Sequence, residues 1–138
     1  MANAGTSGGG SGRPLSPHLQ VYSPQINMVM SIVHRITGAA LYFGTLLLAW
    51  WLIAAATGPE QFELASDLFG SVIGRLILLG YTWALLHHMF GGIRHFIWDT
   101  GRGFQLGTVD FLCWVSLIAS LGLTVVIWVM AGGLEGVF

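Results

Sequence analysis

The sequence predicts an all-α integral membrane protein with three transmembrane helices, and two observations lead to this class. Of the 138 residues, 54% are hydrophobic and only 8% are charged, and the mean hydropathy is +0.74. Soluble domains normally carry about 25% charged residues, so five basic and six acidic side chains are too few to give this chain a water-soluble surface. In addition, the chain contains three apolar stretches, each longer than the roughly 20 residues that cross a bilayer.

The first 27 residues precede the membrane segments. Residues 1–12 consist mainly of Gly, Ser and Ala, which bury nothing, and we expect a flexible tail there. Residues 13–27 hold three of the four prolines and predict an irregular cytoplasmic or interfacial segment. Neither a signal peptide nor an Arg-rich transit peptide is recognisable, which favours a bacterial inner membrane over a mitochondrion for this multi-pass protein.

The membrane domain is expected to cover residues 28–138, with helices at about 28–56, 68–98 and 111–132. The stretches between these helices, 57–67 and 99–110, are short connections. Each helix is long enough for the ~30 Å hydrocarbon core, and the first two can tilt or extend beyond it.

The distribution of arginine predicts the orientation of the helices. The side shared by the N-terminus and the second connection carries four arginines, whereas the other side carries one, Arg75. The four are Arg13, Arg35, Arg94 and Arg102. Because basic residues are enriched on the cytoplasmic side, we expect the N-terminus in the cytoplasm and the C-terminus outside.

Composition also excludes several classes of function. The formal charge is −1 and no basic run is present, so nothing in the sequence favours nucleic acid as a partner. The single cysteine, Cys113, excludes an intramolecular disulfide framework and a cysteine-based metal cage built from this chain alone.

Polar residues inside the apolar stretches are the candidate functional residues, because such groups are costly in a bilayer. The first stretch contains Ser31, His34 and Arg35, whose i, i+3, i+4 spacing places them on one helix face. In the second, His88 and His95 share a stripe with Gly92, and Asp99 follows His95 by four residues.

The helical rise of 1.5 Å per residue gives a depth for each of these residues. Counted from Met28, His34 lies roughly 9 Å deep. Counted from Asp99, His95 lies roughly 6 Å deep and His88 roughly 16 Å deep, near the bilayer midplane. We therefore expect His34 in a shallow polar layer with Arg35 and His95, and His88 alone below it.

This column of polar residues is compatible with a haem. The iron would take the imidazole of His88 at mid-depth, and the propionates would reach cations near the surface. Gly91 and Gly92 would let the flat macrocycle approach the helix. The alternative is that the histidines are packed, hydrogen-bonded residues and that Arg35 and Arg94 extend to the interface. His87 points about 100° away from His88 and is not expected to bind the same iron.

Two segments resemble one known family. RPLSPHLQVY (13–22) followed by SIVHRITG (31–38) is similar to the N-terminal signature of the cytochrome b subunits of succinate dehydrogenase, the larger membrane anchors of respiratory complex II. HHMFGGIRHFIWDTG (87–101) resembles the second signature of that family. The resemblance covers the chain from Arg13 onwards and implies three helices in a heteromeric helix bundle, with the N-terminus inside.

The resemblance also implies roles for single residues. His88 matches the axial ligand of haem b, and Ser31 and Arg35 match residues at the ubiquinone site. His34, Arg94 and His95 match positions around the haem propionates and the quinone pocket, and Asp99 matches a structural position. The implied partners are a flavoprotein, an iron–sulfur protein and a second small membrane anchor that supplies the other haem ligand. Succinate oxidation is then the work of the flavoprotein.

Two redox alternatives stay open at this point. A fumarate reductase anchor would run the reaction in reverse, and a low-potential quinone in the native membrane would favour it. A self-contained b-type cytochrome would hold both axial histidines itself, which the unequal depths of His34 and His88 argue against. A non-redox membrane protein is the third possibility, and it predicts no visible absorption.

Overall fold

A computed structural model describes residues 22–132, and these residues form four helices without a strand. The helices are α1 (Ile26–Thr57), α2 (Pro59–Gly70), α3 (Val72–Asp99) and α4 (Leu106–Met130). Three of them, α1, α3 and α4, are long and apolar enough to cross a membrane. The prediction of an all-α membrane protein with three spans is therefore confirmed. The predicted tail at 1–12 and most of the predicted irregular segment lie outside the described residues.

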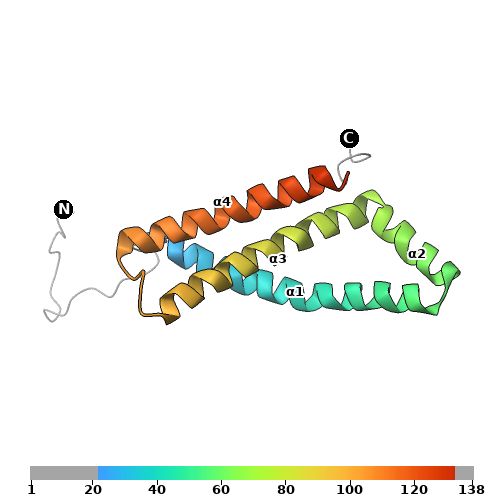
Figure 1. Ribbon diagram of the computed structural model, residues 1–138, viewed down its shortest axis with the longest axis horizontal. Helices are drawn as coiled ribbons and strands as arrows, with labels where there is room; N and C mark the ends of the chain where they lie inside the picture. Colours follow the sequence, from blue (N-terminus) through green and yellow to red (C-terminus); the bar gives the residue numbers. More distant parts are fainter. Residues whose placement is uncertain (1–21, 133–138) are drawn as a thin grey trace, which may run out of the picture.

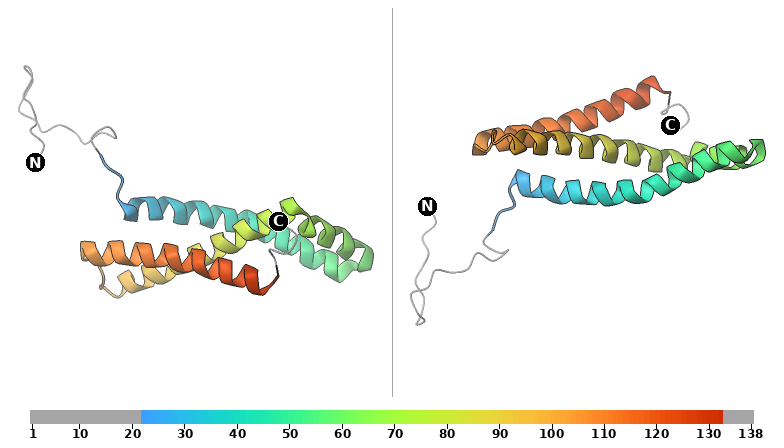
Figure 2. Two further views of the ribbon diagram at one scale, coloured as in Figure 1. Left: turned by 90° about the horizontal axis from the view of Figure 1, so that it is seen from above. Right: turned by 60° about the horizontal axis from the view of Figure 1, so that its bottom comes forward.

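The three long helices run side by side in alternating directions (Figure 1). In the right-hand view of Figure 2, α3 lies between α1 and α4. The start of α1, the end of α3 and the start of α4 meet at one end of the molecule. There Met30, Val109 and Cys113 form a small buried core. Of the residues predicted to share one side of the membrane, those that the structure describes thus lie toward this end of the bundle.

The first connection contains a short helix, α2, which was not predicted from the sequence. Gly58 separates α1 from α2 with a φ of 151°, which favours glycine, and Pro59 occupies the first turn of α2, where no N–H is needed. With 12 residues, α2 is about 18 Å long and too short to span the bilayer. Its Phe62 packs on Trp51 of α1, at a ring-centroid distance of 5.8 Å.

The corner between α2 and α3 sets the true start of α3. The hydroxyl of Ser71 accepts a hydrogen bond from the Gly74 N–H at 3.1 Å and so caps the new helix. A side chain at Gly74 would collide with the backbone of Leu68 and Phe69. The single helix expected over 68–98 therefore begins at Val72.

Most large apolar side chains lie on the outer surface of the helix bundle. Only 6% of the most apolar stretch of α1 is buried, compared with 22% for α3 and for α4. In a membrane protein, such a surface faces lipid or other membrane subunits. Helix α1 therefore offers the largest share of its apolar stretch for contact with lipid or other subunits.

Candidate functional site

The candidate site forms where α1 crosses α3, and each helix provides one glycine and one histidine to the crossing. The His34 ring of α1 lies over Gly91 of α3, and the His88 ring of α3 lies over Gly38 of α1. A Cβ atom at Gly91 would overlap the His34 ring, and one at Gly38 would come within 3.0 Å of the His88 Cε1. The two glycines therefore allow both imidazoles to fit between the helices.

His88 is anchored to α1 through one ring nitrogen. Its Nδ1 lies 3.1 Å from the backbone oxygen of His34 and 3.4 Å from the hydroxyl oxygen of Thr37. A carbonyl oxygen only accepts hydrogen bonds, so Nδ1 is the protonated nitrogen when this bond forms. Nε2 then keeps its lone pair, and no described residue bonds to it. This is the arrangement in which a histidine binds a metal.

His34 lies directly against His88, which corrects the depth argument from the sequence. The two ring centroids are 3.9 Å apart and the planes differ by 14°. The depth of each residue was counted along its own helix, and that count is wrong for two reasons. Helix α1 begins at Ile26 rather than Met28, and the helices cross at an angle, so that side chains at different counted depths come into contact. His88 is therefore not isolated below a shallow layer.

The stack also changes the expected use of the glycines. The space at Gly91 is taken by the His34 ring, so a macrocycle cannot lie there as the sequence suggested. No heavy atom from another part of the described chain comes within 4 Å of a Cβ placed at Gly92. Gly92 is the residue of the pair that leaves the helix surface open beside His88.

The remaining polar residues of the predicted layer lie around this crossing. His95 meets His34 edge to face, with ring centroids 5.4 Å apart, and is exposed. Arg35 is exposed and Ser31 is partly buried, both on α1 within one turn of His34. Asp99 is exposed at the last residue of α3. The structure thus gathers three histidines closely, with Ser31 and Arg35 nearby on the accessible surface of α1.

Arg94 faces a different neighbour from the one that the sequence suggests. It is only 3% exposed, and its Nη1 donates to the Sγ atom of Cys113 on α4 at 3.4 Å. Its guanidinium carbon lies 5.3 Å from the centre of the Trp98 ring. Arg94 therefore joins α3 to α4, and its buried Nε has no hydrogen-bond partner in the described part of the chain.

His87 points away from the stacked histidines, as expected from its position in the helix. It is fully buried, its ring lies 5.3 Å from that of Trp83, and neither ring nitrogen has a hydrogen-bond partner among residues 22–132.

Thr37 and Gly38 are the site residues that sequence reasoning missed. Thr37 follows His34 by three residues, so continuing the same helical stripe would have found it.

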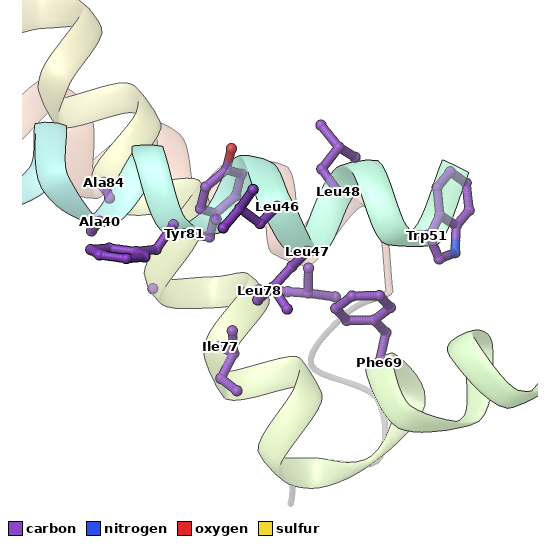
Figure 3. A pocket seen from close by; sticks show the side chains of 13 residues that line it. Ala40, Leu46, Leu47, Leu48, Trp51, Phe69, Ile77, Leu78, Tyr81 and Ala84 are labelled. Carbon is purple, nitrogen blue, oxygen red and sulfur yellow. The ribbon is translucent and has the colours of Figure 1, made fainter. Parts of the chain in front are cut away.

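A large apolar cavity lies on another part of the molecule. It has a volume of about 700 Å³ and is lined almost wholly by hydrocarbon from α1, the end of α2 and α3. Figure 3 shows Leu47, Leu78 and Phe69 around it, with Tyr81 at one side. Its lining contains no charged residue and no histidine, and the Tyr81 hydroxyl is its one ionisable group.

Comparison with known proteins shows the same similarity over most of the chain. A family model described as "Succinate dehydrogenase/Fumarate reductase transmembrane subunit" matches residues 10–131. The chain is 39% identical over 117 residues to the succinate dehydrogenase cytochrome b556 subunit of Rickettsia prowazekii, covering 85% of this chain and 91% of that protein.

Two further relatives extend this comparison. The cytochrome b556 subunit of Paracoccus denitrificans is 47% identical over 94 residues, which covers 68% of this chain and 72% of the relative. The mitochondrial succinate dehydrogenase cytochrome b560 subunit of Homo sapiens is 36% identical over 125 residues, covering 83% and 71%.

Proposed function

The chain belongs to the succinate dehydrogenase/fumarate reductase transmembrane subunit family, and from this premise we propose that it is the cytochrome b anchor of a succinate:ubiquinone oxidoreductase. In this proposal it holds haem b together with a second small anchor and helps to form the site of ubiquinone reduction. A flavoprotein subunit oxidises succinate, and an iron–sulfur subunit delivers the electrons. In this proposal the complex lies in a bacterial inner membrane.

The arrangement around His88 is the observation that carries the haem assignment. The ring is held at Nδ1 by acceptors from α1, which leaves Nε2 available as a ligand. Gly92 leaves the surface of α3 open one turn away. Exposed Arg35 and His95 are suited to the haem propionates, and His34, buried Arg94 and Asp99 are assigned to the surroundings of the site. The bound haem would supply one-electron redox chemistry.

The second axial ligand is assigned to the other anchor subunit. His34 and His88 are stacked face to face at 3.9 Å, and this spacing leaves no room for an iron and a porphyrin between the rings. His87 is buried on the side of α3 that carries Arg94. The proposal therefore no longer depends on unequal depth, and it disfavours the self-contained cytochrome for a geometric reason.

The ubiquinone site is assigned to Ser31 and Arg35 on α1. Quinone reduction places two electrons and two protons on a carbonyl ring, so negative charge develops on the quinone oxygens. A hydroxyl group and a guanidinium group can donate hydrogen bonds to such an oxygen. Both residues lie on α1, the helix whose most apolar stretch is the least buried of the three, where another subunit can complete the site. A neighbouring imidazole, His34 or His95, is suited to proton transfer.

A difference spectrum tests this function. The purified complex, or this chain co-expressed with the second anchor, is expected to show a low-spin, bis-imidazole b-type spectrum when the reduced and oxidised forms are compared. This chain expressed alone is not expected to show it. No visible absorption in the complex would contradict the proposal, and bis-imidazole ligation in the isolated chain would favour the self-contained cytochrome.

The fumarate reductase alternative differs only in direction. The family description covers both enzymes, whereas the relatives compared above are all named as succinate dehydrogenase subunits. Because of these names, we propose succinate oxidation as the physiological direction. Measuring the reduction potential of the native quinone would decide between the two directions.

The proposed orientation can be tested by chemical labelling. A single cysteine placed at Gly103 is expected to react with a membrane-impermeant reagent only from the cytoplasmic side, and one at Gly58 only from outside. Both positions lie between helices, at opposite ends of the bundle. The native Cys113 is fully buried and gives little background. The reverse labelling pattern would overturn the orientation.

A further inference from the structure

The contact between Thr37 and His88 suggests a role that the site assignments above do not include. Thr37 is 2% exposed and lies on the face of α1 that meets α3. We propose that Thr37 is a positioning residue that, with the backbone oxygen of His34, fixes the ring orientation and the protonated nitrogen of the haem ligand His88. This inference rests on the proposed function, because it concerns the same ligand.

Hydrogen-bond directions determine which atoms act in this contact. The Thr37 hydroxyl donates its hydrogen to the His34 backbone oxygen at 3.0 Å. Its lone pairs therefore remain available to the Nδ1–H of His88, 3.4 Å away. The same Nδ1 lies 3.1 Å from the His34 oxygen. A single donor is thus shared by two acceptors, and both acceptors belong to one turn of α1.

The surroundings prevent the acceptors and the ring from moving apart. Burial fixes the Thr37 side chain, and its branched Cβ restricts χ1 further. The His34 ring covers one face of His88 at 3.9 Å, and Gly38 lies close to its Cε1. Rotating the ring by a half turn would exchange Nδ1 with a carbon and give up both acceptors. The contact therefore favours the one orientation in which Nε2 can bind iron.

The test compares threonine variants in the assembled complex. Thr37→Val keeps the shape of the side chain and removes the hydroxyl, Thr37→Ala removes it with less risk of crowding, and Thr37→Ser restores it. Loss of a group that orients a metal ligand typically weakens binding about 10–100-fold. We expect haem loss to excess apomyoglobin to be faster by this order in Thr37→Val and Thr37→Ala, and close to wild type in Thr37→Ser.

Thr45→Val is the matched control. Thr45 lies on the same helix, and its hydroxyl also donates to backbone oxygens, including that of Leu41 at 2.9 Å, but it is exposed and contacts no histidine. It is expected to retain haem as the wild type does. The electron paramagnetic resonance g-values of the haem should shift in Thr37→Val and not in Thr45→Val, because they report the orientation of the axial imidazole.

The outcomes separate this inference from the function on which it rests. If Thr37→Val and Thr37→Ala match Thr45→Val in haem retention and g-values while His88→Ala loses its axial ligation, the positioning role is wrong and the haem assignment stands. If Thr37→Ser is as defective as Thr37→Val, the hydroxyl is not the acting group, and the inference is overturned. If His88→Ala keeps normal haem, His88 is not the iron ligand and the inference falls with that assignment, whereas a complex without any haem absorption would contradict the proposed function itself.

Discussion

Replacing His88 with alanine is expected to remove the bis-imidazole b-type spectrum from the complex of this chain with its partner subunits. The physical reason is that Nε2 of His88 is the available imidazole nitrogen whose ring is already oriented by hydrogen bonds at its other nitrogen. Removing the side chain leaves the iron with at most one axial histidine. The measurement is the reduced-minus-oxidised spectrum, normalised to the amount of assembled complex.

His87→Ala is the closest control for this prediction. His87 is the neighbouring residue in α3, but it is fully buried and packs against Trp83, away from the His34–His88 stack. The variant is expected to keep a nearly intact spectrum. His34→Ala and His95→Ala are expected to shift the haem potential or disturb quinone binding without removing a ligand. A normal spectrum in His88→Ala, or its loss in His87→Ala, would assign the iron to a different residue.

The three membrane helices could be predicted from the sequence because apolar length alone determines them. Three apolar stretches of sufficient length have few alternatives to crossing a bilayer as helices. Helix α2 was not predicted because its sequence is too polar for a membrane-spanning helix. The signals that form it are local, a Gly58–Pro59 start and a serine cap at Ser71 after its end, and they could have been recognised.

The site was predictable in its residue types and less so in its geometry. The periodicity of one helix shows that Ser31, His34 and Arg35 share a face, but it does not fix how that face meets another helix. The crossing of α1 and α3 depends on where Gly38 and Gly91 allow close approach. That is why His34 was placed in a separate layer from His88, and why the contact of Arg94 with Cys113 was not predicted.

A second large effect is expected on electron transfer to ubiquinone. Ser31→Ala and Arg35→Ala are each expected to lower ubiquinone reduction by about 10²–10³-fold, the usual cost of removing a hydrogen bond to developing negative charge. Arg35→Ala is expected to have the larger effect, because the guanidinium is also suited to a haem propionate. Oxidation of succinate with an artificial acceptor should continue, because the proposed function assigns that reaction to the flavoprotein subunit.

Two comparisons make this prediction specific to the quinone. Ser31→Thr keeps a hydroxyl at the same position of α1, so quinone reduction should recover at least partly relative to Ser31→Ala. Arg75→Ala removes an arginine from the first turn of α3, at the opposite end of that helix from Asp99, and should leave quinone kinetics unchanged. Because Arg35 is exposed on α1, its truncation leaves no cavity inside the chain, and a loss of activity can be attributed to the missing guanidinium rather than to unfolding. Unchanged quinone kinetics in both alanine variants would move the site to another part of the complex.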